Sequence, residues 1–185
     1  MNSLLAGFAL LLLPLATAQA QAGNAVPAKE QVLSETHRFL ATYEGTWTEE
    51  VSTLPGPGSD PEKFTLTTVT NMVMGGRFFQ FSQTGEMHGS AFEGSITLGY
   101  DKDSGIFTLC QVTTESTKTL VLEGPWKDPG KSIVLNGTLN VEDKRSVLLQ
   151  QTITFEDKDT ILIENYEPDA NGTLFKSREY HFSRQ

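Results

Sequence analysis

The sequence predicts an all-β domain, an antiparallel up-and-down β-barrel of about 8–10 strands with a short helix before them. Three observations predict this fold. From residue 46 onward, apolar and polar residues alternate in short runs, as they do in half-buried strands. Clusters of Gly, Pro, Asn and Asp separate these runs at short intervals. No second helical pattern interrupts the series, so consecutive runs pair as hairpins, and closure into a barrel hides both edges of the sheet.

The helix is expected immediately before the first strand. Leu33, His37 and Leu40 are spaced so that they share one helical face. Gly45 follows at a position suited to ending the helix. We therefore expect His37 to pack against the end of the barrel as a structural residue.

Ten runs have the character of strands. Their expected ranges are 46–54, 64–74, 76–84, 91–100, 105–113, 117–124, 132–139, 146–155, 160–167 and 173–183. The Asn171-Gly172 pair predicts a tight hairpin, whereas Asn136-Gly137 fits either a turn or a bulge inside a strand. A sandwich of two sheets would show the same alternation and is the alternative architecture.

The N-terminus predicts export. An apolar run from Leu4 to Leu15 precedes two small-x-small patterns, which end at Ala20 and Ala22. We expect residues 1–20 to be a signal peptide cleaved near Ala20 or Ala22, residues 21–29 a flexible leader, and residues 30–185 the barrel domain. The run is too short to span a bilayer, so the expected mature protein is secreted or periplasmic and has no membrane anchor.

Charge and cysteine content narrow the possible partners and stabilising bonds. The formal net charge of −9 repels nucleic acid, which is not an expected partner. The single cysteine, Cys110, cannot form a disulfide within the chain, and we expect it to be a small buried residue in the strand 105–113. Stability is therefore expected to come from the core and the hydrogen-bonded sheet.

The segment Gly45-Thr46-Trp47 resembles the Gly-x-Trp element of the calycin superfamily, which includes the lipocalins. In that superfamily the Trp plugs one end of the barrel beneath an N-terminal helix, and an Arg from the last strand lies across its ring. The resemblance implies that Arg178, in the last predicted strand, lies on Trp47. Such a cation–π contact is worth about 0.5–2 kcal/mol.

The chain resembles more closely a bacterial family known as domain of unknown function 1579. The matching segments are His37 to Leu40, Gly45-x-Trp47, Met74 to Phe78, Met87 to Gly94, Leu98 to Asp101, Glu164, and Lys176 to Tyr180. Membership implies a fold and no established activity.

The sequence carries no convincing catalytic or metal site. No two of the three histidines have the spacing of zinc ligands, and there is no Gly-x-Ser-x-Gly elbow or phosphate-binding loop. A lone histidine, His88 or His181, would be the candidate for an iron ligand if the barrel held haem. We predict no metal and no cofactor.

The aromatic residues predict a ligand-binding interior. The expected lining of the barrel combines aromatic and polar side chains: Phe79, Phe81, Phe92, Phe107, Glu164, Tyr166 and Tyr180. Arg178 is the natural partner for a buried Glu164. The leading hypothesis is a non-enzymatic protein that binds or carries a small apolar or amphipathic ligand.

Two alternatives remain open at this point. One is a structural or protein-interaction module whose barrel is filled with side chains and whose protein partner is unknown. The other is a cryptic enzyme, which requires Glu164, His88 or Arg77 to converge in one pocket.

Overall fold

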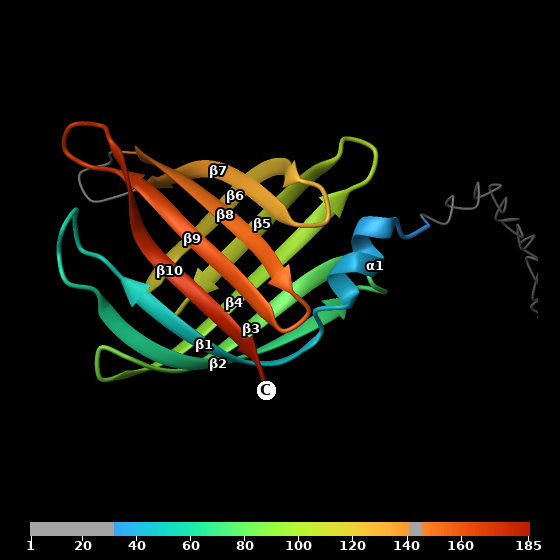
Figure 1. Ribbon diagram of the computed structural model, residues 1–185, viewed down its shortest axis with the longest axis horizontal. Helices are drawn as coiled ribbons and strands as arrows, with labels where there is room; N and C mark the ends of the chain where they lie inside the picture. The colour runs from blue at the N-terminus through green and yellow to red at the C-terminus, as the bar shows by residue number, and fades with distance from the viewer. Residues whose placement is uncertain (1–31, 141–145) are drawn as a thin grey trace, which may run out of the picture. The chain divides into compact units, whose positions relative to one another are not determined.

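The computed structural model describes residues 32–140 and 146–185, and within this part of the chain Leu33–Gln185 form one compact unit. One helix and ten strands are present among the described residues (Figure 1). The predicted signal peptide (1–20) and leader (21–29) lie outside the described residues. No helix in the described ranges is long and apolar enough to cross a membrane.

The helix α1 spans Glu35–Ala41. The strands are β1 (Gly45–Thr53), β2 (Glu62–Val73), β3 (Phe78–Met87), β4 (Ser90–Asp101), β5 (Ile106–Thr113), β6 (Ser116–Asp128), β7 (Ser132–Asn140), β8 (Ser146–Asp157), β9 (Thr160–Pro168) and β10 (Leu174–Arg184).

The ten strands form a single closed antiparallel barrel. Each strand pairs with its neighbours in the chain, and β1 also pairs with β10, which closes the sheet. The predicted lipocalin-like up-and-down barrel is therefore confirmed, and the sandwich alternative is wrong because one sheet closes on itself. Closure leaves no strand edge to pair with another chain.

Alternation along each strand decides which side chains face the interior. In β5, Phe107 and Leu109 are fully buried and Gln111 is nearly so, which places them on the inner face. Cys110 lies between Leu109 and Gln111 and is exposed, so the prediction that it is a buried residue is wrong. The error arises because both faces of this strand carry apolar residues, Val112 among them, and only the pairing register separates them.

Glycines allow β6 and β7 to come very close. A Cβ at Gly124 would lie 2.0 Å from the carbonyl oxygen of Val134, and a Cβ at Gly137 would lie 2.5 Å from that of Val121. No larger residue fits at either position without moving the backbone. Gly137 lies inside β7, and the pairing of β7 with β8 runs through Asn136 and Gly137 without a register shift, so the pair forms neither a turn nor a bulge.

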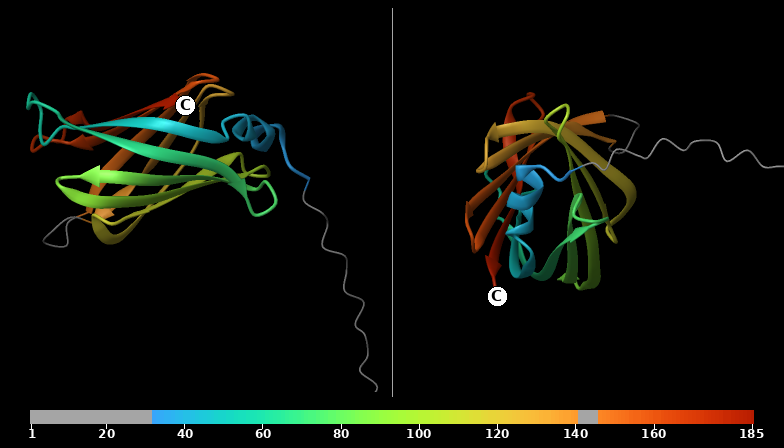
Figure 2. Two further views of the ribbon diagram at one scale, coloured as in Figure 1. Left: turned by 90° about the horizontal axis from the view of Figure 1, so that it is seen from below. Right: turned by 90° about the vertical axis from the view of Figure 1, so that its right-hand side faces the viewer.

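The helix α1 lies across one end of the barrel (Figure 2). Ser34 caps the helix, and Nδ1 of His37 accepts a hydrogen bond from the Ser34 backbone N–H at 3.2 Å. His37 is buried and packs edge-on against Tyr100 with ring centroids 5.8 Å apart. Leu40, one turn further along, joins the hydrophobic core.

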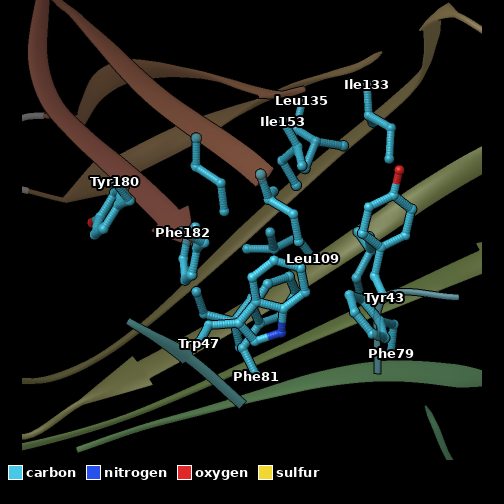
Figure 3. Packing of buried hydrophobic residues seen from close by; sticks show 14 of the residues in the cluster. Tyr43, Trp47, Phe79, Phe81, Leu109, Ile133, Leu135, Ile153, Tyr180 and Phe182 are labelled. Atoms are coloured by element: carbon cyan, nitrogen blue, oxygen red, sulfur yellow. The ribbon is translucent and has the colours of Figure 1, made fainter. Parts of the chain in front are cut away.

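Aromatic side chains fill the barrel on the side of α1, which we call the helix end. Phe39 and Tyr43 from the helix region pack on Phe155 with ring centroids 5.1 and 4.7 Å apart. Trp126 extends the same cluster, since it packs on Phe39 at 5.7 Å and on Phe107 at 4.9 Å. Deeper inside, Trp47, Phe81 and Phe182 gather around the barrel axis (Figure 3). Among the described residues, the helix end is thus a packed aromatic core.

Candidate functional site

The other end of the barrel, which we call the open end, contains a pocket of about 390 Å³. Its walls come from β1 and β5 to β10 and from the loop after β1. Part of the wall is apolar: Leu54, Pro55, Leu120, Leu139, Leu149 and Phe175. The rest of the lining is mostly polar and includes Gln111, Glu115, Asn165, Glu167, Arg178 and Tyr180. The volume lies within the range of small-molecule sites in proteins.

Arg178 is a cation of this polar lining. Its guanidinium lies 3.6 Å from Glu115, and its side chain is only 28% exposed. The neighbouring Tyr180 hydroxyl, followed by the charges of Glu115 and Glu167, raises the pKa of Arg178. Tyr180 is itself buried, and burial raises its pKa. The two side chains therefore present a permanently charged donor and a neutral hydroxyl to the pocket.

A local irregularity in β10 brings Arg178 into the interior. The pairing of β10 with β9 shifts between Lys176 and Arg178, so the strand has an extra residue at this point. Ser177, which is nearly buried, donates a hydrogen bond from its hydroxyl to Glu167 at 2.9 Å. Bulges of this kind re-aim the side chains beside them. Here the bulge places Ser177 and Arg178 together in the lining of the pocket.

A buried carboxylate occupies the middle of the barrel. Glu49 has no exposed surface; Gln83 donates to it from Nε2 at 2.7 Å, and the Thr68 hydroxyl also donates. Burial raises the pKa of Glu49 to about 7, although these two hydrogen bonds oppose the increase. The Glu49 charge in turn contributes to the raised pKa of Tyr180, which lines the pocket. Glu49 is therefore electrostatically coupled to the pocket wall.

Amide side chains continue this polar layer around the barrel. Gln151 donates from Nε2 to Oδ1 of Asn165 at 2.8 Å, and both residues are buried. Three buried oxygens in the described residues have no hydrogen-bond partner: Oγ1 of Thr53 and Oε1 of Gln83 and Gln151. Such atoms are costly in a structural core. Of the three residues, Thr53 lines the pocket, and Gln151 is bonded to the lining residue Asn165.

The predicted lining residues divide into three groups. Phe79, Phe81 and Phe107 are fully buried in the packed core, and Phe92 is almost as deeply buried. Among the predicted lining residues, Tyr180 alone is part of the pocket wall. The four predicted phenylalanines therefore fill the core and do not line the pocket.

Glu164 and Tyr166 are on the outside of the barrel, which corrects the prediction that they face inward. They alternate in β9 with Ile163 and Asn165, whose side chains are buried. Glu164 pairs on the outer surface with Lys176, whose Nζ lies 3.1 Å away and also contacts Glu179. The predicted Glu164–Arg178 pair is consequently not formed, because the two side chains lie on opposite faces of the sheet.

Arg184, and not Arg178, lies over Trp47. The guanidinium carbon of Arg184 is 4.3 Å from the ring centroid, and Trp47 is directly opposite Arg184 in the sheet. Arg178 is paired with Thr53 at the open end of the same strand. A Cβ on Gly45 would lie 2.6 Å from Nη1 of Arg184, so the glycine of the Gly-x-Trp element makes room for this arginine.

The constellation required for the cryptic-enzyme alternative is not assembled. Arg77 is in the β2–β3 connection at the helix end, Glu164 is on the outer face, and His88 is in the turn after β3 at the open end. His181 alternates with the buried Tyr180 and Phe182 and so faces outward. Among the described residues, no group of three or more His, Cys, Asp or Glu is placed to hold a metal ion.

Several pocket residues escaped sequence reasoning. Gln111, Asn165 and Glu167 are polar residues that belong to no recognised motif in the sequence. Only their spacing of two or four residues from buried neighbours such as Leu109 and Ile163 indicates that they point inward, because alternate residues of a strand share a face. Polar residues at inward positions of several adjacent strands, all near the same end, are the signal that identifies this site.

The residues from 33 to 184 match a family model described as "Protein of unknown function (DUF1579)". The chain belongs to this family. No curated protein matches it. The resemblance in sequence motifs described above is thereby confirmed for the family itself.

The comparison with solved structures found similar chains. The chain is similar to Rv2717c from M. tuberculosis, with a TM-score of 0.60 and 16% identity, over 83% of this chain and 99% of that one. A redesigned β-barrel, b11L5F_LGL, matches with a TM-score of 0.45 and 9% identity, over 80% of this chain and 96% of that one. At these identities the likeness to Rv2717c shows the fold alone.

Proposed function

We propose that this DUF1579 protein is a non-enzymatic binding protein that holds a small amphipathic molecule in the open-end pocket. The observation that carries the proposal is the pocket itself, of about 390 Å³, whose lining contains both leucines and polar or charged side chains. An amphipathic molecule satisfies both, because it buries its apolar part against leucines and offers its polar part to Arg178, Tyr180 and Asn165.

The difference between the inward residues of the two ends of the barrel supports the same conclusion. Side chains that only maintain the fold fill the helix end completely, as Phe79, Phe107 and Leu109 do. The open end instead has an inward lining of polar side chains, and one of them, Thr53, has a buried Oγ1 without a hydrogen-bond partner. A barrel that serves only as an interaction module does not require such an inward polar lining.

The test uses two neighbouring substitutions on opposite faces of β6. Leu120 lines the pocket, whereas Val121 is 48% exposed on the outside. The uncharged dye Nile red should become fluorescent on binding the wild-type protein. Leu120→Trp should abolish this binding by filling the pocket, and Val121→Trp should preserve it, with thermal unfolding confirming that both variants fold. Equal dye binding by the two variants would contradict the proposal and favour the interaction module.

Export is a second part of the proposal. The apolar run from Leu4 to Leu15 and the small residues Ala18 and Ala20 support a signal peptide. Intact-mass measurement of the protein from its own host should give a mature chain that begins at Gln21 or Gly23. Native mass spectrometry of the same preparation should show a co-purified small molecule. An uncleaved chain in the cytoplasm would refute export without affecting the binding site.

A further inference from the structure

The ion pair between Arg178 and Glu115 crosses the mouth of the barrel. Glu115 is at the tip of the hairpin between β5 and β6, and Arg178 is in β10. In the closed order of strands, four strands separate β10 from β5 in either direction, which makes them opposite walls. The two charged groups therefore meet over the pocket that both of them line.

This ion pair is a weak one. The closest nitrogen and oxygen are 3.6 Å apart, which is longer than a charge-assisted hydrogen bond, and the Glu115 side chain is 31% exposed. The other carboxylate oxygen of Glu115 lies 3.6 Å from His88 on the neighbouring β3–β4 turn. Glu115 thus bridges Arg178 and His88, and His88 is a partner that it can retain if it leaves Arg178. Glu115 belongs to the two-residue connection, Thr114 and Glu115, between β5 and β6.

Arg178, by contrast, is fixed from inside the barrel. The Tyr180 hydroxyl contacts it, and its place beside the bulge of β10 leaves most of its side chain buried. A planar guanidinium binds an oxyanion best through two parallel hydrogen bonds. Glu115, reaching across the mouth, does not come close enough to make them.

We propose that the ligand of this pocket carries an anionic oxygen head group, of the carboxylate class, which replaces Glu115 on Arg178. This inference rests on the proposed function and names the ligand class of the same site. In the free protein Glu115 occupies the position of the ligand's head group and holds the hairpin tip over the mouth. Binding exchanges one carboxylate for another, and Glu115 turns toward His88. The apolar tail of the ligand lies against Leu120 and Leu149.

The experiment compares three probes with the same eight-carbon tail by isothermal titration calorimetry: octanoate, octanol and octylamine. The wild-type protein should bind octanoate about tenfold more tightly than octanol, since a charge-assisted pair with arginine is worth that factor. Octylamine should bind weakest. Arg178→Met should remove the preference for octanoate while octanol still binds.

The decisive test removes the Glu115 carboxylate, which is proposed to compete with the ligand's head group for Arg178. Glu115→Gln should raise the affinity for octanoate several-fold and leave that for octanol unchanged, because only the acid competes with Glu115. Glu62→Gln is the matched control. Glu62 also lies 3.6 Å from His88, but among the described residues it forms no ion pair with Arg178. Glu62→Gln removes the same charge as Glu115→Gln and should change the affinity for octanoate much less.

The outcomes separate the two levels of the proposal. If Glu115→Gln and Glu62→Gln raise the affinity for octanoate equally, the increase comes from the change in net charge alone, and the inference is overturned. Equal binding of octanoate and octanol by the wild-type protein would overturn it as well, while leaving the pocket as a binding site. If none of the three probes binds and Nile red also fails to bind, the proposed function itself fails.

Discussion

The helix end and the open end of the barrel are built from the same ten strands but differ in what their inward residues do. At the helix end, β10 contributes Phe182 to the core and Arg184 over Trp47. A few residues earlier the same strand contributes Ser177 and Arg178 to a pocket. Alternation sets which residues point inward at both ends, and only the choice of residue makes one end a core and the other a site.

The comparison teaches that burial alone does not identify a binding region in a barrel. The most deeply buried aromatic residues are those with neighbours on every side. A binding region is recognised by inward polar groups whose partners are incomplete, such as Gln151 and Thr53. Substitutions at the two ends should therefore have opposite profiles, with large effects on stability at one and on binding at the other.

The largest effect is expected at the helix end. Phe79→Ala should lower the free energy of unfolding by about 3–5 kcal/mol, because Phe79 is completely buried and its neighbours do not collapse into the space. Phe175→Ala, in the pocket wall, should cost about 1 kcal/mol because the wall already borders open space. Urea denaturation of both variants measures the difference. Similar losses at the two positions would erase the distinction between the ends.

The buried Glu49, between the two ends, should give the next largest effect. Its pKa is raised from 4.5 to about 7 in the folded state, so the folded protein binds the proton more tightly than the unfolded chain. Its contribution to stability is therefore greatest below pH 4.5, falls as the pH rises from 4.5 to 7, and is constant above. The total change is about 3 kcal/mol.

Glu49→Gln isolates this contribution. The stability of the variant relative to the wild type should increase by about this amount between pH 4.5 and 7. Glu50→Gln, at the outward-facing neighbour, is the control and should give a pH profile close to that of the wild type. Denaturation curves at several pH values provide the measurement. A flat difference between Glu49→Gln and the wild type would mean that Glu49 is ionised throughout.

The two arginines of β10 should give the smallest of these differences. Arg184→Met removes the contact with Trp47 and hydrogen bonds to the carbonyl oxygens of Thr42 and Glu44, at a cost of about 2 kcal/mol. Arg178→Met should cost about 1 kcal/mol or less, because its ion pair is long and partly exposed. Thermal unfolding ranks the two variants. A larger loss of stability in Arg178→Met than in Arg184→Met would contradict the assignment of Arg184 as the arginine that stabilises the end of the barrel.

Much of the fold follows from the sequence because strands and turns are local features. The expected strands agree with the observed ones to within a few residues, as β8 (146–155 expected, Ser146–Asp157 found) and β9 (160–167 expected, Thr160–Pro168 found) show. The helix and the closed, sequential order of strands were also predictable. These features depend on periodicity and on short connections, which one sequence records.

The site depends on information that is not local. Arg178 and Arg184 have the same parity, so alternation treats them alike, and only the pairing register with β1 assigns Arg184 to Trp47. In β9, Ile161, Leu162 and Ile163 are all apolar, so the pattern does not show that Glu164 faces outward and Asn165 inward. Register and side-chain direction come from tertiary pairing, which a single sequence does not specify.

The pairing of β1 with β10 has a consequence for how the chain reaches its native state. The Arg184 guanidinium donates to the backbone oxygen of Glu44, a contact between positions 140 residues apart. Contacts of such high sequence separation slow folding, because the entropy of closing the long loop is lost before the contact contributes any stability. Until β10 docks, β1 and β9 are unpaired edges able to recruit a second molecule. A nonsense or frameshift mutation that removes only the final strand would therefore leave most of the hairpins able to form and still yield a protein prone to aggregation.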